Sequence, residues 1–401
     1  MKKFENVATI KNNPKWKNAT KRETELYSHT YGLTTMRTEF DRDYTRIINS
    51  NAYKRLKHKT QVFFSPDNDH ICTRIEHVNL VESVSYTIAS YLGLNTELTR
   101  AIAVAHDLGH SSFGHQGEKI LSTIAQREVG EPFWHEKNGL HFVDNLELLI
   151  DFENKKRNLD LTYAVRDGII SHCGEIDEES LSPRKEWIDL KQYQKPNEFA
   201  PYTWEACVVK IADKISYIGR DIEDAKVMKI LTEKEIQTIN SMIQKIDVNH
   251  SNIINFLTVD LCKNSSPEKG LRFSKEAMEV MKTIKDFNYE KIYKNEKISP
   301  SIRYFKLVIN EIFYCLENEF AEKRTIYNLK KLSRYYPNLS DGFVTWLANY
   351  AQTEDRNEAD FNNKIIYNLQ NKTDYAKAII DYISGMTDSY IIQIYDEIVR
   401  F

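Results

Sequence analysis

Apolar residues recur along most of the chain at intervals of three and four, which is the spacing of an amphipathic helix. Residues 77–94 carry one such stripe, which consists of Val78, Val81, Val84, Ile88 and Leu92. Residues 203–225 carry a broader apolar face, so we expect this helix to be largely buried. That face consists of Val208, Val209, Ile211, Ala212, Ile215, Ile218 and Ile222. Helical patterns continue to the end of the chain and predict an all-α fold.

Further helices are predicted from residue 39 onward, over 139–153 and over 161–175, and Thr96 is the predicted N-cap of the helix that precedes residue 106. Residues 176–200 are charged and contain two prolines, so we expect a loop or lid there.

Three consecutive regions follow from these patterns. Residues 1–36 are polar and predict an arm that packs on a partner subunit or a loosely ordered tail. Residues 37–230 hold the candidate chemistry and form the predicted core. Residues 231–401 are a succession of helical segments, from which we expect an outer helical bundle and subunit contacts.

Composition narrows the class of protein. The 401 residues contain only 13 glycines and 9 prolines, which favours helices over a sandwich or barrel. The net charge of −3 gives no global basic field that would demand nucleic acid. Five widely spaced cysteines without a CxxC motif argue against a disulfide framework and a structural zinc site, and predict a cytoplasmic protein. No apolar run approaches the ~18 residues of a membrane span.

The stretch AIAVAHDLGHSSFGHQGE, residues 101–118, is the strongest candidate for chemistry. An apolar helical run delivers His106 and Asp107 side by side, and His110, His115 and Glu118 follow within twelve residues. The alternative is a polar helix end with ordinary surface histidines. Clusters of histidine and carboxylate at this density are typical of metal or catalytic sites, which favours a site here.

Two other helices carry residues that belong with this stretch. His77 lies in the first turn of the preceding helix, and a short turn between antiparallel helices brings it toward His106. Asp213, Tyr217 and Asp221 recur at every fourth position and share one helix face. A buried aspartate needs a partner charge or a metal. The alternative for Asp213 and Asp221 is a ladder of salt bridges within the helix, to Lys210 and Lys214.

Two nitrogens and two carboxylates suit one divalent ion, and we predict His77, His106, Asp107 and Asp213 as its ligands. Such an ion lowers the pKa of a bound water towards ~7 and polarises a phosphoryl oxygen. His110, His115 and Glu118 are then candidates for a general acid, a general base or a hydrogen-bond donor to phosphate. Arg74, Lys214 and Tyr217 are candidates for binding negative charge on phosphorus. The predicted reaction is metal-assisted hydrolysis of a phosphoester or phosphoanhydride.

Residues 42–59 form the most basic stretch, which is either a cationic wall for a polyphosphate or a solvated helix face. Gln61 follows it and could read a sugar hydroxyl through its amide, or remain a surface residue. His135 either binds the substrate or supports residues that do, or it is an ordinary residue at the N-terminus of a helix.

The ordered set His77, His106-Asp107 and Asp213 matches the H…HD…D signature of the HD-domain metal phosphohydrolases. Within that family the chain resembles the bacterial deoxyguanosine-triphosphate triphosphohydrolase-like group, over about residues 37–225 and again near the C-terminus. The motifs that carry the resemblance are RLKHKTQVF, TRIEHVNLVE, HDLGHSSFGHQGE, VRDGIISH, KIADKISYIGRDIEDA and DYISGMTDSY.

This resemblance implies an all-α HD-domain core with an additional C-terminal helical bundle, assembled as a homo-oligomer, a tetramer or hexamer. It implies that water attacks the α-phosphorus of a dNTP, with dGTP the first guess, and that deoxynucleoside and intact triphosphate leave. It assigns the metal to the four ligands named above, catalysis to His115 coupled to Glu118, and phosphate contacts to Arg74, His110, Lys214 and Tyr217. Gln61 and Asp221 would lie beside the sugar. His135 is a further substrate-binding candidate, on its position in the sequence alone.

Departures from the group leave the base preference open. Ser111-Ser112 replaces a common Pro-Pro, and Ile211 and Lys214 replace the tryptophan and second aspartate of a common WADD. The identity of the divalent metal also stays open among Mn, Mg, Fe, Co, Ni and Zn. A second dNTP that activates the enzyme and single-stranded DNA are further candidate partners. The competing functions are another HD-type nucleotidase or phosphodiesterase, and a nucleotide sensor or single-strand DNA-binding protein that keeps a relic site. The intact ligand set argues against a relic.

Overall fold

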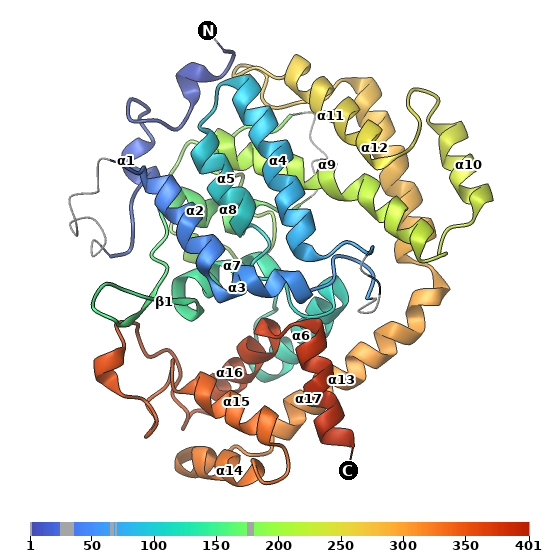
Figure 1. The fold of residues 1–401 in the computed structure, drawn as a ribbon. Helices are drawn as coiled ribbons and strands as arrows, with labels where there is room; N and C mark the ends of the chain where they lie inside the picture. The colour runs from blue at the N-terminus through green and yellow to red at the C-terminus, as the bar shows by residue number, and fades with distance from the viewer. Residues whose placement is uncertain (1, 25–35, 65–67, 69, 175–179, 401) are drawn as a thin grey trace. The chain divides into compact units, whose positions relative to one another are not determined.

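The computed structural model describes residues 2–24, 36–64, 68, 70–174 and 180–400. Helices dominate this part of the chain, and its only sheet has two strands of three residues each (Figure 1). The prediction of an all-α fold is confirmed. The chain divides into two units: unit 1 comprises Met1–Ile48, Asp67–Asp107 and Asp160–Ser299, and unit 2 comprises Asn49–Pro66, Leu108–Leu159 and Pro300–Phe401. The three consecutive regions expected from the sequence stay a prediction.

Unit 1 is built around three helices, α4, α5 and α9, which pack against one another (Figure 1). Its α-helices are α1 (Trp16–Ala19), α2 (Glu39–Asn49), α4 (Arg74–Leu92), α5 (Thr96–Ala105), α8 (Tyr163–Ser171), α9 (Trp204–Val227), α10 (Glu233–Met242), α11 (His250–Asn264) and α12 (Lys275–Asn288). Its short helical turns are η1 (Glu5–Val7), η5 (Leu190–Gln192), η6 (Tyr289–Tyr293) and η7 (Glu296–Ile298).

The apolar stripes predicted for α4 and α9 form the core of this unit. Every residue of both predicted stripes is buried. Burying such side chains removes apolar surface from water at roughly 25 cal/mol per Å², and this is the main force that holds the three helices together. The loop expected over 176–200 contains η5, and its residues 176–179 lie outside the described residues.

The N-terminal segment packs on its own unit. Phe4 is fully buried with its ring edge-on to Trp204 at 5.0 Å, and its N–H donates to the Leu92 carbonyl at 2.8 Å. The buried carboxylate of Glu205 accepts hydrogen bonds from Thr9 and from the Asn95 N–H. Residues 2–24 therefore do not form a loose tail. They pack against other residues of unit 1 and do not extend away from it as a separate arm. Residues 1 and 25–35 of the predicted arm lie outside the described residues.

Unit 2 contains the remaining helices and the sheet. Its α-helices are α3 (Asn51–Arg55), α6 (Gly114–Glu128), α7 (His135–His141), α13 (Ser299–Glu317), α14 (Thr325–Leu332), α15 (Pro337–Leu347), α16 (Lys372–Gly385) and α17 (Asp388–Val399). Its short helical turns are η3 (Leu56–His58), η4 (Phe142–Leu146), η8 (Glu322–Arg324) and η9 (Glu358–Asp360). Helix α16 packs against α6, and α15 packs against α17.

The helix expected over 139–153 was partly wrong. It ends after η4, and the chain turns into strand β1 (Leu148–Ile150), which pairs antiparallel with β2 (Lys156–Asn158). Asp151 closes the hairpin, because its side chain accepts the backbone N–H groups of Glu153 and Lys155 at 2.8 and 2.9 Å. A short apolar run is compatible with either a helix or a strand. Here the hairpin turn at Asp151 determines that residues 148–150 form a strand.

The predicted cap of α5 was wrong by one residue. Asn95, not Thr96, is the N-cap, and its side-chain oxygen accepts the N–H groups of Glu97 and Leu98. An asparagine side chain reaches these free N–H groups as well as a threonine does.

No helix in the described ranges has the length and apolarity needed to cross a membrane. All five cysteines lie within the described ranges and carry free thiols, as the sequence led us to expect.

Candidate metal centre and catalytic cluster

The start of α4 places His77 in the core of unit 1. Thr73 caps this helix in a capping box with Glu76, whose carboxylate accepts the Thr73 N–H at 2.7 Å. The helix therefore begins at Arg74, and one turn later His77 is buried. Its Nε2 atom lies 3.0 Å from Asp213 Oδ1, across the gap to α9.

His106 follows the last turn of α5 and presents a bare nitrogen. Its Nδ1 lies 2.6 Å from the Ala103 carbonyl oxygen, which can only accept, so Nδ1 carries the proton and Nε2 carries a lone pair. This Nε2 is buried and has no hydrogen-bond partner among the described residues. It lies 3.5 Å from Asp107 Oδ1 and 3.9 Å from Asp213 Oδ1.

One ligand atom from each of His77, His106 and Asp213 lies within 4.8 Å of the others, and Asp107 Oδ2 lies 3.9 Å from His77 Nε2. Burial disfavours the charged imidazole, but Asp213 and Asp107 outweigh it and raise the pKa of His77. Burial likewise opposes ionisation of Asp213, yet the neighbouring histidines lower the pKa of that carboxyl. A divalent cation would take the place of the proton they share, so this donor set fits a metal.

Arg74 forms an ion pair with one of these residues. Its Nη1 donates to Asp107 Oδ2 at 2.8 Å, and the Arg74 side chain is only 1% exposed. The sequence predicted this arginine as a phosphate ligand. The structure gives it a buried carboxylate partner, Asp107, and this contact fixes the orientation of the Asp107 side chain.

Helix α9 carries the other residues predicted on this face. Lys214 and Asp221 are buried, and Tyr217 is half-buried. Asp221 accepts a hydrogen bond from the hydroxyl of Tyr293. Burial raises the pKa of Asp221 to about 7, although the Tyr293 hydrogen bond opposes this. The observed partners of Asp213 and Asp221 come from other elements, which disfavours a ladder within α9.

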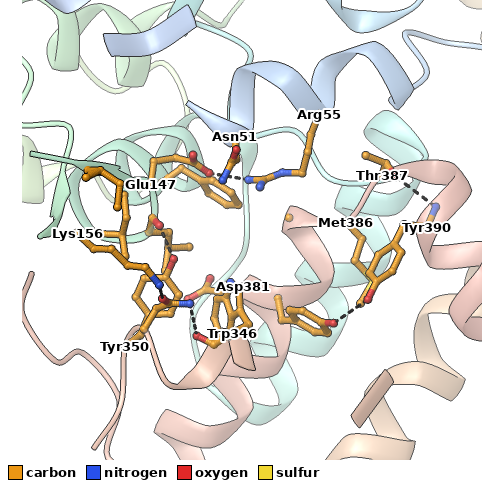
Figure 2. A pocket seen from close by; sticks show the side chains of 17 residues that line it. Asn51, Arg55, Glu147, Lys156, Trp346, Tyr350, Asp381, Met386, Thr387 and Tyr390 are labelled. Carbon is orange, nitrogen blue, oxygen red and sulfur yellow. Dashed lines mark hydrogen bonds and ion pairs between the residues drawn. The ribbon is translucent and has the colours of Figure 1, made fainter. Parts of the chain in front are cut away.

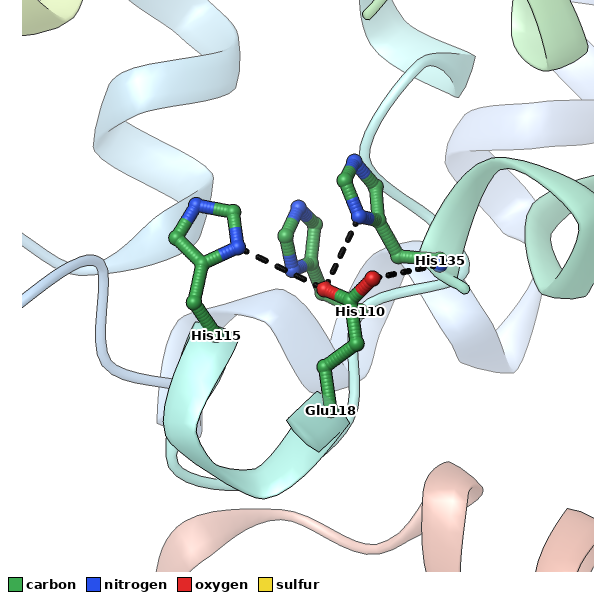
Figure 3. A group of neighbouring side chains, drawn as sticks. All are labelled: His110, His115, Glu118 and His135. Atoms are coloured by element: carbon green, nitrogen blue, oxygen red, sulfur yellow. Dashed lines mark hydrogen bonds and ion pairs between the residues drawn. The ribbon is translucent and has the colours of Figure 1, made fainter. Parts of the chain in front are cut away.

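The second cluster lies in unit 2 and consists of His110, His115, Glu118 and His135 (Figure 3). Glu118 is its centre: Oε2 lies 3.0 Å from His135 Nδ1 and 3.4 Å from His115 Nδ1, and Oε1 accepts the His135 N–H at 3.2 Å. The rings of His110 and His135 stack with centroids 3.8 Å apart. All three catalytic residues predicted from the sequence therefore meet, with His135 among them.

The electrostatics of this cluster keep Glu118 ionised. Burial favours the neutral acid, but the imidazoles of His135, His115 and His110 lower the pKa of Glu118 far below its usual range. The side chain of His115 is 64% exposed, whereas that of Glu118 is 16% exposed. His115 is therefore an accessible imidazole backed by a carboxylate, an arrangement suited to proton transfer.

Glycine at position 109 allows the two segments of this cluster to meet. A Cβ at Gly109 would lie 2.1 Å from the Gly139 nitrogen and from the His135 carbonyl oxygen. The Asn138 amide donates to the Gly109 carbonyl at 2.7 Å and fixes the approach. His135 is also the first residue of α7, as one of the two sequence-based interpretations expected, and its role in substrate binding stays a prediction.

Four basic side chains of the stretch over 42–59 already have partners in the structure. Arg42 pairs with Glu39, Arg46 with Asp43, and Arg55 with Glu147. Lys59 is buried and donates to the carbonyls of His110 and Ser384. These partners disfavour the interpretation of these four side chains as a cationic wall. Gln61, two residues further on, is buried.

A cavity of about 520 Å³ in unit 2 contains none of the predicted site residues (Figure 2). Three of its charged residues are paired within the wall: Arg55 Nη2 lies 2.7 Å from Glu147 Oε1, and Lys156 Nζ donates to Asn349 Oδ1 at 2.9 Å. Much of the remaining wall is aromatic. One side is formed by Gly385, the last residue of α16, and by Met386 and Thr387, which precede α17.

Sequence reasoning missed two groups of residues at these sites. His172 stands edge-on to His106, with ring centroids 5.0 Å apart, and only the motif VRDGIISH drew attention to it. Thr60 and Asp388 were within recognised motifs, but nothing in their spacing indicated that they contact each other.

Comparison with known proteins shows the family to which the chain belongs. The HD domain model matches residues 74–218, and the phosphohydrolase-associated domain model matches residues 340–397. A deoxyguanosinetriphosphate triphosphohydrolase-like protein of Caldanaerobacter subterraneus subsp. tengcongensis is 31% identical over 363 residues, which cover 90% of this chain and 85% of the relative. A protein of the same name from Rickettsia bellii is 31% identical over 384 residues, or 91% of this chain and 92% of the relative.

The chain belongs to the HD-domain, deoxyguanosinetriphosphate triphosphohydrolase-like family. The family prediction is thereby confirmed, and the chain is an HD-domain phosphohydrolase. All four predicted metal ligands, together with His110, His115, Glu118 and His135, lie inside the HD domain match. The DYISGMTDSY motif lies inside the phosphohydrolase-associated domain match.

Proposed function

We propose that this phosphohydrolase cleaves dNTPs to deoxynucleoside and inorganic triphosphate. In this reaction the oxygen of water bonds to the α-phosphorus, and the bond from that phosphorus to the 5′-oxygen of deoxyribose breaks. The observation that carries the proposal is the pairing of an accessible His115 with an ionised Glu118 in a chain that also holds a complete donor set for a divalent metal. The printed name of the relatives supports a deoxynucleoside triphosphate as substrate and dGTP as the first to test.

The metal ligands in this proposal are His77, His106, Asp107 and Asp213. A bound divalent ion supplies Lewis acidity toward phosphate oxygens. Arg74 holds Asp107 through the ion pair, and the Ala103 carbonyl holds His106 in the tautomer that leaves Nε2 available. Such supporting contacts fix ligand orientation.

His115 is the proposed proton-transfer residue. Its Nδ1 faces Glu118, so Nε2 is the atom left to exchange a proton with the substrate. Glu118 stabilises the imidazolium, and His135 shares the same carboxylate. His110, which stacks on His135, is the residue of this cluster that we propose donates a hydrogen bond to a phosphate of the substrate.

The remaining roles follow the sequence-based assignments. Lys214 and Tyr217 would contact phosphates, and Gln61 and Asp221 would lie by the sugar. A direct phosphate contact of Arg74 would have to coexist with its ion pair to Asp107, so the supporting role is the better supported one. We further propose a cytoplasmic homo-oligomer, with an activating dNTP or single-stranded DNA as additional partners.

The test is product analysis of the purified protein with Mn²⁺ and each dNTP, by ion-exchange chromatography and ³¹P NMR. Deoxynucleoside with intact triphosphate supports the proposal, and His115→Ala should abolish it. Orthophosphate or a monophosphate would instead support another HD-type nucleotidase. Absence of turnover with mixed dNTPs, while Mn²⁺ still binds, would support a nucleotide sensor or DNA-binding protein.

A further inference from the structure

The DYISGMTDSY motif has no role in the reaction proposed above, yet its residues form hydrogen bonds to two segments of unit 2 that carry proposed site residues. Helix α16 ends at Gly385 and α17 begins at Asp388, and we refer to residues 384–388 as the α16–α17 turn. Thr387 caps α17, and its hydroxyl accepts the Tyr390 N–H at 3.2 Å. This cap fixes the direction of the Asp388 side chain at the first position of the helix.

Both oxygens of Asp388 are used, and they hold different segments. Oδ1 accepts the Phe113 N–H at 2.9 Å, while Oδ2 accepts the Thr60 N–H at 2.8 Å and also the Thr60 hydroxyl. The residue is 4% exposed, so water competes little for these bonds. A buried carboxylate that accepts backbone N–H groups makes strong, charge-assisted hydrogen bonds.

The two segments carry the residues proposed to act on substrate. Thr60 directly precedes Gln61. Phe113 is the N-cap of α6, the helix that presents His115 and Glu118, and it has no side-chain cap of its own. Its φ of 61° lies in the left-handed region, which a non-glycine residue keeps only when its surroundings hold it there. The Asp388 carboxylate and the Phe305 ring, stacked on Phe113 at 4.1 Å, are those surroundings.

The rest of the α16–α17 turn binds the same two segments. Ser112 donates its hydroxyl to the Met386 carbonyl at 2.8 Å. Lys59 donates to the Ser384 carbonyl at 3.0 Å and also to the carbonyl of His110. Each segment on either side of the turn is therefore held by at least two independent hydrogen bonds.

We propose that Asp388 is a positioning residue, which fixes the start of α6 and the segment before Gln61 so that His115 and Gln61 keep their working geometry. This inference rests on the proposed function for its catalytic consequence, but not for its structural one. It gives the phosphohydrolase-associated domain a defined task, because that domain supplies the turn. Displacing catalytic groups by about 1 Å can cost on the order of 100-fold in rate.

The test compares Asp388→Ala and Asp388→Asn with Asp396→Asn, a control on the same helix whose partner is Arg400 near the end of the chain. Hydrogen exchange is measured over residues 59–61 and 112–118, together with kcat, KM and Mn²⁺ affinity. We expect Asp388→Ala to raise exchange about tenfold in both segments and to lower kcat about 10–100-fold. Exchange in α4 and α9, Mn²⁺ affinity and the control variant should stay unchanged.

Asparagine can accept for only one of the two segments, so Asp388→Asn should be intermediate. Should Asp388→Ala fail to fold, Thr60→Val removes one hydroxyl donor and should lower kcat severalfold while leaving α6 protected. Unchanged exchange and unchanged kcat in Asp388→Ala would overturn the proposal, and so would a change confined to overall stability. If the unmodified protein turns over no dNTP, the proposed function fails, and the exchange data still decide the positioning role.

Discussion

Arg74 Nη1 lies 2.8 Å from Asp107 Oδ2, and neither side chain is more than 5% exposed. This pair joins a predicted phosphate ligand to a predicted metal ligand. It means that the positive charge of Arg74 is already committed to a carboxylate, and that Asp107 is oriented before any metal arrives. A contact of this kind turns a residue next to the metal set into a determinant of metal affinity.

Replacing Arg74 with methionine should weaken metal binding. We expect Mn²⁺ affinity to fall about 10–100-fold, because Asp107 loses its orienting partner. The free energy of unfolding should fall by about 3–5 kcal/mol, because a buried carboxylate is left uncompensated. Titration calorimetry and chemical unfolding measure the two effects. Arg100→Met is the control, since Arg100 pairs with Glu82 at the surface and should cost at most about 1 kcal/mol. Unaltered Mn²⁺ binding in Arg74→Met would refute this role.

Metal should stabilise the fold through His106. Mn²⁺ at about 100 times its Kd should raise the free energy of unfolding by about 2.7 kcal/mol. His106→Ala should lose this gain, because the buried Nε2 lone pair is removed. Thermal unfolding with and without Mn²⁺ measures it. His250→Ala, a buried histidine of unit 1 outside the metal set, should keep the gain. Equal Mn²⁺ stabilisation in both variants would argue for a different site.

Glu118→Gln should separate catalysis from metal binding. Glutamine cannot stabilise the imidazolium of His115, so we expect kcat to fall about 100-fold or more while Mn²⁺ affinity stays unchanged. Glu128→Gln is a closely matched control: the same substitution at the end of the same helix, on a side chain that is also 16% exposed. Steady-state rates with dNTP decide between them. Comparable rates in the two variants would remove Glu118 from the reaction.

Asp221 should make stability fall as pH rises. Burial raises its pKa from the ordinary 3.8 to about 7, so the folded state binds an extra proton between these values. Its contribution to stability is complete below about pH 4 and is lost as pH rises through about 7. Asp221→Asn mimics the protonated acid and should flatten this slope, by on the order of 2–4 kcal/mol between pH 5 and pH 8.

Chemical unfolding at several pH values measures the slope. A smaller slope should remain in Asp221→Asn, since burial also raises the pKa of Asp224 to about 6. Tyr293→Phe removes the hydroxyl that donates to Asp221 and should move the transition to higher pH. Identical slopes in the unmodified protein and Asp221→Asn would show that Asp221 is ionised in the fold.

Local sequence pattern was sufficient to predict most of the long helices and to select the candidate metal ligands. The helical periodicity of α4 and α9 predicted every buried position of their stripes, because burial on a helix repeats with its own geometry. His77, His106 and Asp213 were predicted together because their helices are long and strongly patterned. The strand at Leu148–Ile150 could not be predicted in this way, since three residues are too few to display a period.

The sequence by itself determined the long helices, their buried faces and the identity of the candidate donor groups, all of which depend on residues close together in the chain. Only the tertiary structure decided which carboxylate Arg74 meets, that His135 joins Glu118, and that Asp388 holds Phe113 from 275 positions away. The physical reason is that many charged and polar residues are chemically equivalent partners. The choice among them depends on distance and burial, and these exist only once the helices have packed.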